Sequence, residues 1–70
     1  MIFFKFIRAC NKYRFSFVLS TYGKVTLVLR PKNTFENINL EEKYLDYCSI
    51  YKLFSNAIKE MKEYRKERGF

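Results

Sequence analysis

The stretches YRFSFVLS at residues 13–20 and KVTLVLR at residues 24–30 decide the fold of this chain. In both, large apolar residues alternate with mostly small or polar ones, which is the period of a strand with one buried face. The link between them contains Gly23, which can take the positive φ that tight antiparallel turns need. Pro31 lacks the backbone donor that would let the second stretch continue. The two stretches therefore predict an antiparallel hairpin.

The preceding segment, residues 2–9 (IFFKFIRA), is rich in aromatic and β-branched residues but alternates less regularly. Because a short connection at residues 10–12 would pair it with residues 13–20, we expect it to be the first strand of a three-stranded antiparallel sheet. The side chains expected on the inner face of this sheet are Ile2, Phe4, Phe6, Tyr13, Phe15, Phe17, Leu19, Val25, Leu27 and Leu29.

The C-terminal part of the chain has the period of a helix. Residues 34–39 are expected to be a connector, and residues 40–67 one long amphipathic helix. Asn39 and Glu42 are spaced as in a capping box, and Gly69 is a typical helix stop. The stripe expected to face the sheet consists of Leu40, Tyr44, Tyr47, Tyr51, Phe54, Ile58 and Met61. The predicted fold class is α+β, a three-stranded antiparallel sheet with one long C-terminal helix on one face (β-β-β-α).

A chain of 70 residues forms one domain, here residues 1–70. The predicted domain has a basic sheet (1–33), a connector (34–39) and a helix (40–67). A domain of this size buries only about 60% of the surface of its unfolded chain, so its stability margin is small. The aromatic content of 20% compensates in part and argues against a disordered chain.

The predicted helix is longer than the sheet that it covers. About 28 helical residues extend ~42 Å, whereas strands of seven or eight residues extend ~25 Å. Further apolar residues widen the helix stripe towards one side. These residues are Ile50, Leu53, Ala57 and Tyr64. We expect them to form a homodimer interface or a groove for a partner.

The net charge of +7 lies entirely in the first half of the chain. Residues 1–33 contain seven basic residues and no acidic one, whereas residues 34–70 contain seven of each. A basic surface interspersed with aromatic and aliphatic side chains is typical of nucleic-acid binding, and β-sheets can read a major groove. The candidate contacts are Lys5, Arg14, Lys24 and Arg30 on the outer sheet face, Arg8, Lys12 and Lys32 at its rim, and Phe3 as a stacking or wedging ring.

Three other interpretations of this surface stay open. The cations could simply be solvated and keep the sheet soluble. Alternatively, the chain could be a protein-targeting inhibitor or regulator of a host enzyme or defence complex, in an anti-CRISPR-like role, because Ile7, Val18 and Val28 are unusual choices for plain solvent. Binding to an anionic membrane surface is the least favoured, and no membrane partner is predicted.

The residues needed for common catalytic chemistry are scarce. The chain has no histidine, only two glycines, and two isolated cysteines, Cys10 and Cys48. General acid–base catalysis, a phosphate-binding glycine loop and a zinc site are therefore not predicted, and we expect a non-enzymatic protein without a metal or cofactor. Reduced cysteines and the charges that interrupt MIFFKFIRAC predict an unprocessed cytoplasmic protein. The abundance of Lys, Asn, Ile, Tyr and Phe suggests an AT-rich gene of phage or mobile-element origin.

Overall fold

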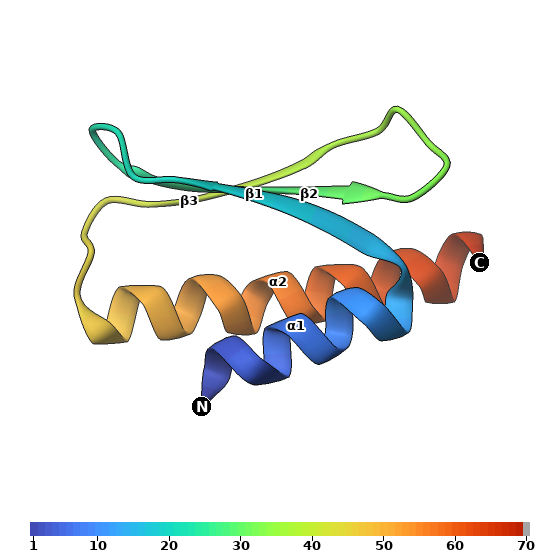
Figure 1. Ribbon diagram of the computed structural model, residues 1–70, viewed down its shortest axis with the longest axis horizontal. Helices are drawn as coiled ribbons and strands as arrows, with labels where there is room; N and C mark the ends of the chain where they lie inside the picture. The colour runs from blue at the N-terminus through green and yellow to red at the C-terminus, as the bar shows by residue number, and fades with distance from the viewer. Residues whose placement is uncertain (70) are drawn as a thin grey trace.

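A three-stranded antiparallel sheet lies over two helices that cover one of its faces (Figure 1). The computed structural model describes residues 1–69. The elements in chain order are α1 (Ile2–Tyr13), β1 (Phe15–Ser20), β2 (Val25–Pro31), β3 (Ile38–Glu42) and α2 (Tyr47–Arg68). The predicted fold class is confirmed: the protein is α+β, with a three-stranded antiparallel sheet followed by a C-terminal helix. A helix at the N-terminus is an addition to the predicted plan.

The predicted hairpin is formed by β1 and β2. The two strands pair antiparallel, with Val18 opposite Val28. Gly23 in the turn has a φ of 78°, as expected for a residue that reverses the chain. Pro31 is the last residue of β2, in agreement with its predicted role as a strand end.

The predicted first strand over residues 2–9 is wrong, because this segment is part of helix α1. Its buried side chains are Phe6, Ala9 and Cys10, which recur three and four residues apart and so lie on one side of a helix. The high β-propensity of Ile and Phe suggested a strand, but packing of this apolar side against α2 and the sheet overrides that preference. Arg14, with φ 58° and ψ 60°, ends the helix and redirects the chain into β1.

The third strand of the sheet lies where the connector and the helix start were predicted. Strand β3 pairs antiparallel with β2, and Leu40 lies opposite Leu27. Ile38 and Leu40 are half-buried and pack against the core, whereas Asn39 between them is exposed. This alternation is present in the sequence, but Leu40 and the acidic residues after it are also good helix formers.

Helix α2 begins seven residues later than predicted. Its N-cap is Asp46 rather than Asn39, and the Asp46 side chain accepts a hydrogen bond from the Ser49 backbone N–H at 3.4 Å. The helix ends at Arg68, and Gly69 caps it with a φ of 74°, so the predicted stop is confirmed. With 22 residues, α2 is ~33 Å long.

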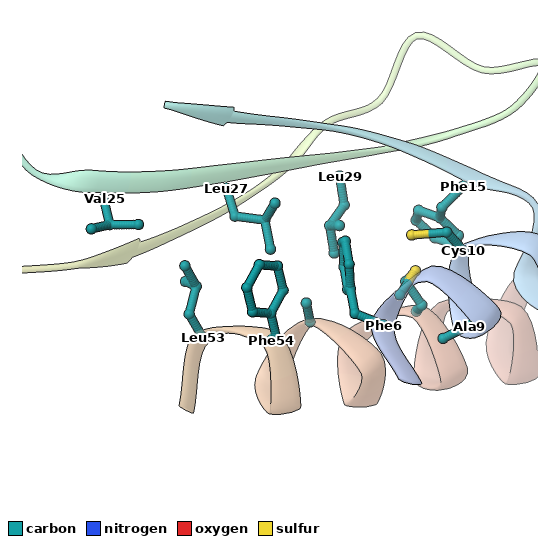
Figure 2. Packing of buried hydrophobic residues seen from close by; sticks show 11 residues of the cluster. Phe6, Ala9, Cys10, Phe15, Val25, Leu27, Leu29, Leu53 and Phe54 are labelled. Atoms are coloured by element: carbon teal, nitrogen blue, oxygen red, sulfur yellow. The ribbon is translucent and has the colours of Figure 1, made fainter. Parts of the chain in front are cut away.

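The hydrophobic core lies between the sheet and the two helices. Figure 2 shows Leu27 and Leu29 of β2 pointing towards Phe54 of α2 and Phe6 of α1. The ring centroids of Phe6 and Phe54 are 4.7 Å apart, and Phe17 packs edge-on against Phe6 at 4.8 Å. The buried cluster consists of Phe6, Ala9, Cys10, Phe15, Val25, Leu27, Leu29, Leu53, Phe54, Ala57 and Met61.

Several residues predicted to be in the core are exposed instead. Phe4 points away from α2 because the helical period places it opposite Phe6, and Leu19 lies at the open end of β1. Tyr47 and Tyr51 are exposed as well, because the buried side of α2 is centred on Leu53 and Ala57 rather than on the predicted stripe. Tyr44 is exposed in the loop that precedes α2. Among residues 1–69, no helix combines the length and the apolar character needed to cross a bilayer.

Candidate functional site

Three of the predicted contact cations, Lys5, Arg8 and Lys12, lie on α1 rather than on the outer face of the sheet. All three are exposed. Their spacing of three and four residues places them within about 60° of each other around the helix axis. We call these three residues the basic stripe. A strand would have divided them between two faces, so the change from strand to helix brings them together.

The basic stripe has no carboxylate partner among residues 1–69, where the only ion pairs are Lys24–Glu41 and Arg68–Glu36. Lys12 does lie over the ring of Tyr13, 5.3 Å from its centroid. The stripe therefore keeps its charge available to an anionic partner.

Two aromatic residues of α1, Phe3 and Phe4, differ in how far their rings are free to contact a ligand. Phe4 is 63% exposed and makes a ring contact with Phe3, at 6.5 Å between centroids. Phe3, which the sequence suggested as a stacking ring, packs edge-on against Phe54 at 5.6 Å and is partly used by the core. The more accessible ring beside the stripe is thus Phe4, a residue that the sequence analysis had assigned to the core.

The outer face of the sheet is less basic than predicted. Lys24 and Arg30 do lie on the exposed side, but Lys24 Nζ is 3.0 Å from Glu41 Oε2 and Arg30 Nε donates to Asn37 Oδ1 at 3.0 Å. Both partners come from or adjoin β3, which was not expected in the sheet. The outer face therefore carries one neutralised cation and one that is engaged by an amide.

The remaining predicted cations, Arg14 and Lys32, meet at the junction between α1, β1 and the end of β2. The backbone N–H of Lys32 donates to the Arg14 carbonyl at 2.9 Å. Both residues line a hollow of about 260 Å³ beside the C-terminal end of α2. We call it the basic hollow; it is lined by Arg14, Lys32, Asn33, Thr34, Tyr64, Arg65, Arg68 and Gly69.

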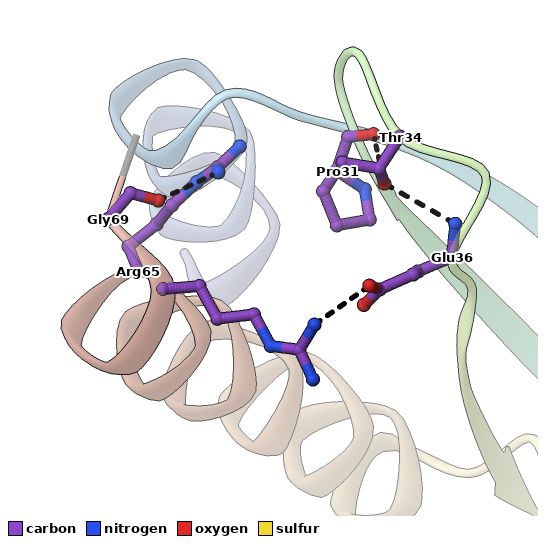
Figure 3. Close-up of polar contacts among 6 residues, drawn as sticks. Pro31, Thr34, Glu36, Arg65 and Gly69 are labelled. Atoms are coloured by element: carbon purple, nitrogen blue, oxygen red, sulfur yellow. Dashed lines mark hydrogen bonds and ion pairs between the residues drawn. The ribbon is translucent and has the colours of Figure 1, made fainter.

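Arg65 connects the ends of α1 and α2, a role that was not predicted from the sequence. Its guanidinium donates to the carbonyl of Tyr13 at 2.6 Å, of Arg14 at 2.9 Å and of Gly69 at 3.1 Å. The same guanidinium lies over the ring of Phe15, 5.2 Å from the centroid. The contact with Gly69 is shown in Figure 3. A basic residue in the last turn of a helix could be expected to bind carbonyls, but its long-range partners could not be read from sequence.

The neighbouring turn is ordered by local hydrogen bonds. The Thr34 hydroxyl donates to the Pro31 carbonyl at 3.2 Å and accepts from the Glu36 backbone N–H at 3.3 Å (Figure 3). Asn33 has a φ of 71°, a conformation that Asn tolerates better than most residues. The Glu36 carboxylate then pairs with Arg68 at 2.8 Å.

The predicted dimer or partner interface on α2 is wrong for two of its four residues. Leu53 and Ala57 are buried in the core, 2% and 0% exposed, because they face the layer between the sheet and the helices. Ile50 is half-buried against the same cluster, and Tyr64 packs edge-on against Phe15 at 5.5 Å. Dimerisation itself stays a prediction, without the interface that motivated it.

A different apolar surface is exposed at the N-terminal end of α2. We call it the tyrosine ridge; it consists of Tyr44, Leu45, Tyr47 and Tyr51, which are 46–76% exposed. The rings of Tyr47 and Tyr51, one turn apart, are stacked with centroids 6.4 Å apart. The spacing of these two tyrosines was visible in the sequence, but it was assigned to the core-facing stripe.

The pKa values of one thiol and one carboxyl are shifted by their surroundings. Burial raises the pKa of the Cys10 thiol to about 11, and nearby Lys32 offsets this only in part. The hydrogen bond from Ser49 lowers the pKa of the Asp46 carboxyl, which is the usual effect of a helix cap. Cys48 is exposed, and neither cysteine is in a disulfide. Across the described part of the chain, no group of three or more His, Cys, Asp or Glu side chains is placed to hold a metal ion.

No protein-family model, curated protein or solved structure matches this chain.

Proposed function

We propose that the protein is a non-enzymatic binding protein whose basic stripe contacts the phosphate backbone of nucleic acid or of a nucleoprotein complex. The observation that supports this most strongly is the placement of Lys5, Arg8 and Lys12 on one exposed side of α1, with no ion pair to a carboxylate in residues 1–69. Binding of this kind is electrostatic and positions the protein without reading sequence.

The dimensions of the stripe suit a phosphate backbone. Lys5 and Lys12 are separated by about 10.5 Å along the helix axis. Duplex DNA presents one phosphate per ~3.4 Å of axis on each strand. A helix lying along one strand would therefore place its three cations over about three nucleotide steps, with Phe4 beside them to contact a sugar or a base edge.

The cellular setting of the proposal is the cytoplasm, or the host-cell cytoplasm if the gene belongs to a phage. Nucleic acid is accessible there, and the two free thiols, Cys10 and Cys48, match a reducing compartment.

The test is a salt titration of binding to a short duplex, with Lys5→Gln/Arg8→Gln/Lys12→Gln as the variant. The matched control is Lys52→Gln/Lys59→Gln/Lys62→Gln, which removes three exposed cations from α2. The wild-type log–log slope should be about −0.9 for each phosphate neutralised, and the stripe variant should lose roughly 2.7 of it. Absence of wild-type binding at 50 mM salt, or an equal loss in the control, would refute the proposal.

A second candidate function is supported by the tyrosine ridge. Tyrosine is enriched at protein interfaces because its ring is apolar and its hydroxyl can still hydrogen-bond. An exposed cluster of this kind fits an inhibitor or regulator that binds a host enzyme or defence complex.

A pull-down after nuclease treatment, at two salt concentrations, separates the two functions. For a protein-directed function, one stoichiometric partner should be retained by the stripe variant and lost by Tyr47→Ala/Tyr51→Ala. Loss of all captured material on nuclease treatment would instead favour the nucleic-acid function.

A further inference from the structure

We infer that the basic hollow is a binding site for a phosphate monoester, separate from the basic stripe. Cations from three parts of the chain line it: Arg14 after α1, Lys32 after β2, and Arg65 and Arg68 at the end of α2. No acidic residue is among the described residues that line it. Arg68 is paired with Glu36 and Arg65 is held by carbonyls, so Arg14 and Lys32 supply the charge that an anion would neutralise.

The acidic side chains of this region lie on the other side of Arg68. A second hollow, between β3 and α2, is lined by glutamates together with Arg68, Tyr64 and Ile38. These glutamates are Glu36, Glu60, Glu63 and Glu67. Only Glu36 reaches a cation of the basic hollow, through its ion pair with Arg68. Among residues 1–69, neither Arg14 nor Lys32 has a side-chain ion pair, so both can bind a ligand.

The backbone that carries this lining is held in place before any ligand arrives. Arg65 is fixed by three backbone carbonyls, and the backbones of Arg14 and Lys32 are joined by a hydrogen bond of 2.9 Å. The adjoining turn is closed by the Thr34 hydroxyl (Figure 3). A preorganised site loses less conformational entropy on binding than a set of free surface lysines. Arg65 lies in the last turn of α2 and binds the Gly69 carbonyl, so it also offsets the negative end of the α2 dipole, which would otherwise oppose an anion.

The size and donor set of the hollow identify the class of ligand. At about 260 Å³ it is smaller than the roughly 300–1,000 Å³ pockets that enclose drug-sized ligands, so it suits a single anionic group. The Arg14 guanidinium matches the oxygens of phosphate, the Lys32 ammonium adds a second charge, and the Asn33 amide adds neutral donors. A monoester carries a charge of about −1.5 to −2 and three free oxygens, so it gains more from clustered cations than an internal phosphodiester does.

The site is tested by titrating the full chain with inorganic phosphate at constant ionic strength and following backbone amide signals. Saturable shifts should appear at Asn33, Thr34 and Gly69. The variant Arg14→Asn/Lys32→Gln should weaken binding roughly tenfold or more, because two charge-assisted contacts are lost. Asn is chosen at position 14 because it tolerates the positive φ there. Lys59→Gln/Lys62→Gln removes the same charge from α2 outside the hollow and should leave binding unchanged.

Two sources of the phosphate group are then distinguished with oligonucleotides. If the hollow holds a strand end, a 5′-phosphorylated single strand should bind several-fold more tightly than its 5′-hydroxyl form, and Arg14→Asn/Lys32→Gln should abolish that difference. If it holds a small phosphorylated molecule, inorganic phosphate should saturate it while the 5′ phosphate makes no difference. Absence of saturable shifts with every probe, or equal weakening in the control, would overturn the site.

This inference can fail separately from the proposed function. Phosphate should still titrate the hollow in Lys5→Gln/Arg8→Gln/Lys12→Gln, because none of these residues lines it. Duplex binding without phosphate binding would refute the phosphate site and leave the proposed function standing. Phosphate binding without duplex binding would refute the proposed function and leave the phosphate site standing.

Discussion

The basic stripe on α1 and the outer face of the sheet both come from the acid-free residues 1–33, yet they differ in usable charge. On α1, three cations face solvent without a carboxylate among residues 1–69. On the sheet, Lys24 is paired with Glu41 and Arg30 with Asn37. The difference shows that the net charge of a sequence segment is not enough to predict a binding surface. The element that packs beside the segment determines how many of its cations stay unpaired.

The neighbour responsible is β3. It lies along β2 and places Glu41 opposite Thr26, within reach of the lysine that precedes the strand. One side of α1 packs against α2 and the sheet, and within residues 1–69 no acidic side chain forms an ion pair with the cations on its other side (Figure 1).

The largest effect is expected where α1 is attached to the core. Phe6 is fully buried between α2 and the sheet, so Phe6→Ala should lower the free energy of unfolding by about 3–5 kcal/mol in urea titrations. Phe6→Leu is the milder variant if the alanine form does not fold. Phe4→Ala, at an exposed position of the same helix, should change stability by less than about 0.5 kcal/mol. Equal losses at both positions would contradict the docking of α1 through Phe6.

The next effect concerns the contact that holds the end of α1 against α2. Arg65→Lys should cost about 1.5–3 kcal/mol of unfolding free energy, because an ammonium cannot reach the three carbonyls that the guanidinium binds. Arg68→Lys is the matched control and should cost at most about 1 kcal/mol, since its pair with Glu36 is exposed. Similar losses for the two variants would show that the carbonyl contacts are not what holds this junction.

The burial of Cys10 on α1 should make the free energy of unfolding depend on pH. The pKa of Cys10 is raised from 9.0 to about 11 in the folded protein, so the unfolded chain loses this proton first. Stability from this group is therefore intact below pH 9 and should fall by roughly 1–2 kcal/mol between pH 9 and pH 11. The difference in pH slope between the wild type and Cys10→Ala isolates this effect from tyrosine and lysine titration. Identical slopes would show that Cys10 ionises equally in both states.

The smallest effect is expected at the outer face of the sheet. Glu41→Gln should change stability by less than about 1 kcal/mol, because the Lys24–Glu41 pair is exposed. In duplex-binding titrations it should make the salt slope more negative by at most about 0.9, as one lysine is freed. Glu60→Gln removes the same charge from α2 and serves as the control. A larger gain with Glu60→Gln would show that net charge, rather than the pairing of Lys24, governs the sheet face.

The alternation around Phe15 and Leu27 was enough to predict the hairpin, because a strand with one buried face has a period of two that few other structures share. Gly69 was enough to predict where α2 ends. The N-terminal segment and the residues around Leu40 could not be assigned in the same way, because their residue types suit both a helix and a strand. The cation spacing of Lys5, Arg8 and Lys12 was the available signal for a helix at the N-terminus.

The fold class, the β1–β2 hairpin and the confinement of the excess charge to residues 1–33 followed from local sequence patterns. The strand that completes the sheet, the pairing of its cations, and the meeting of Arg14, Lys32, Arg65 and Arg68 in one hollow depend on long-range packing. The physical reason is range: alternation and capping act between neighbours along the chain, whereas ion pairing and the edge of a sheet depend on residues brought together from far apart.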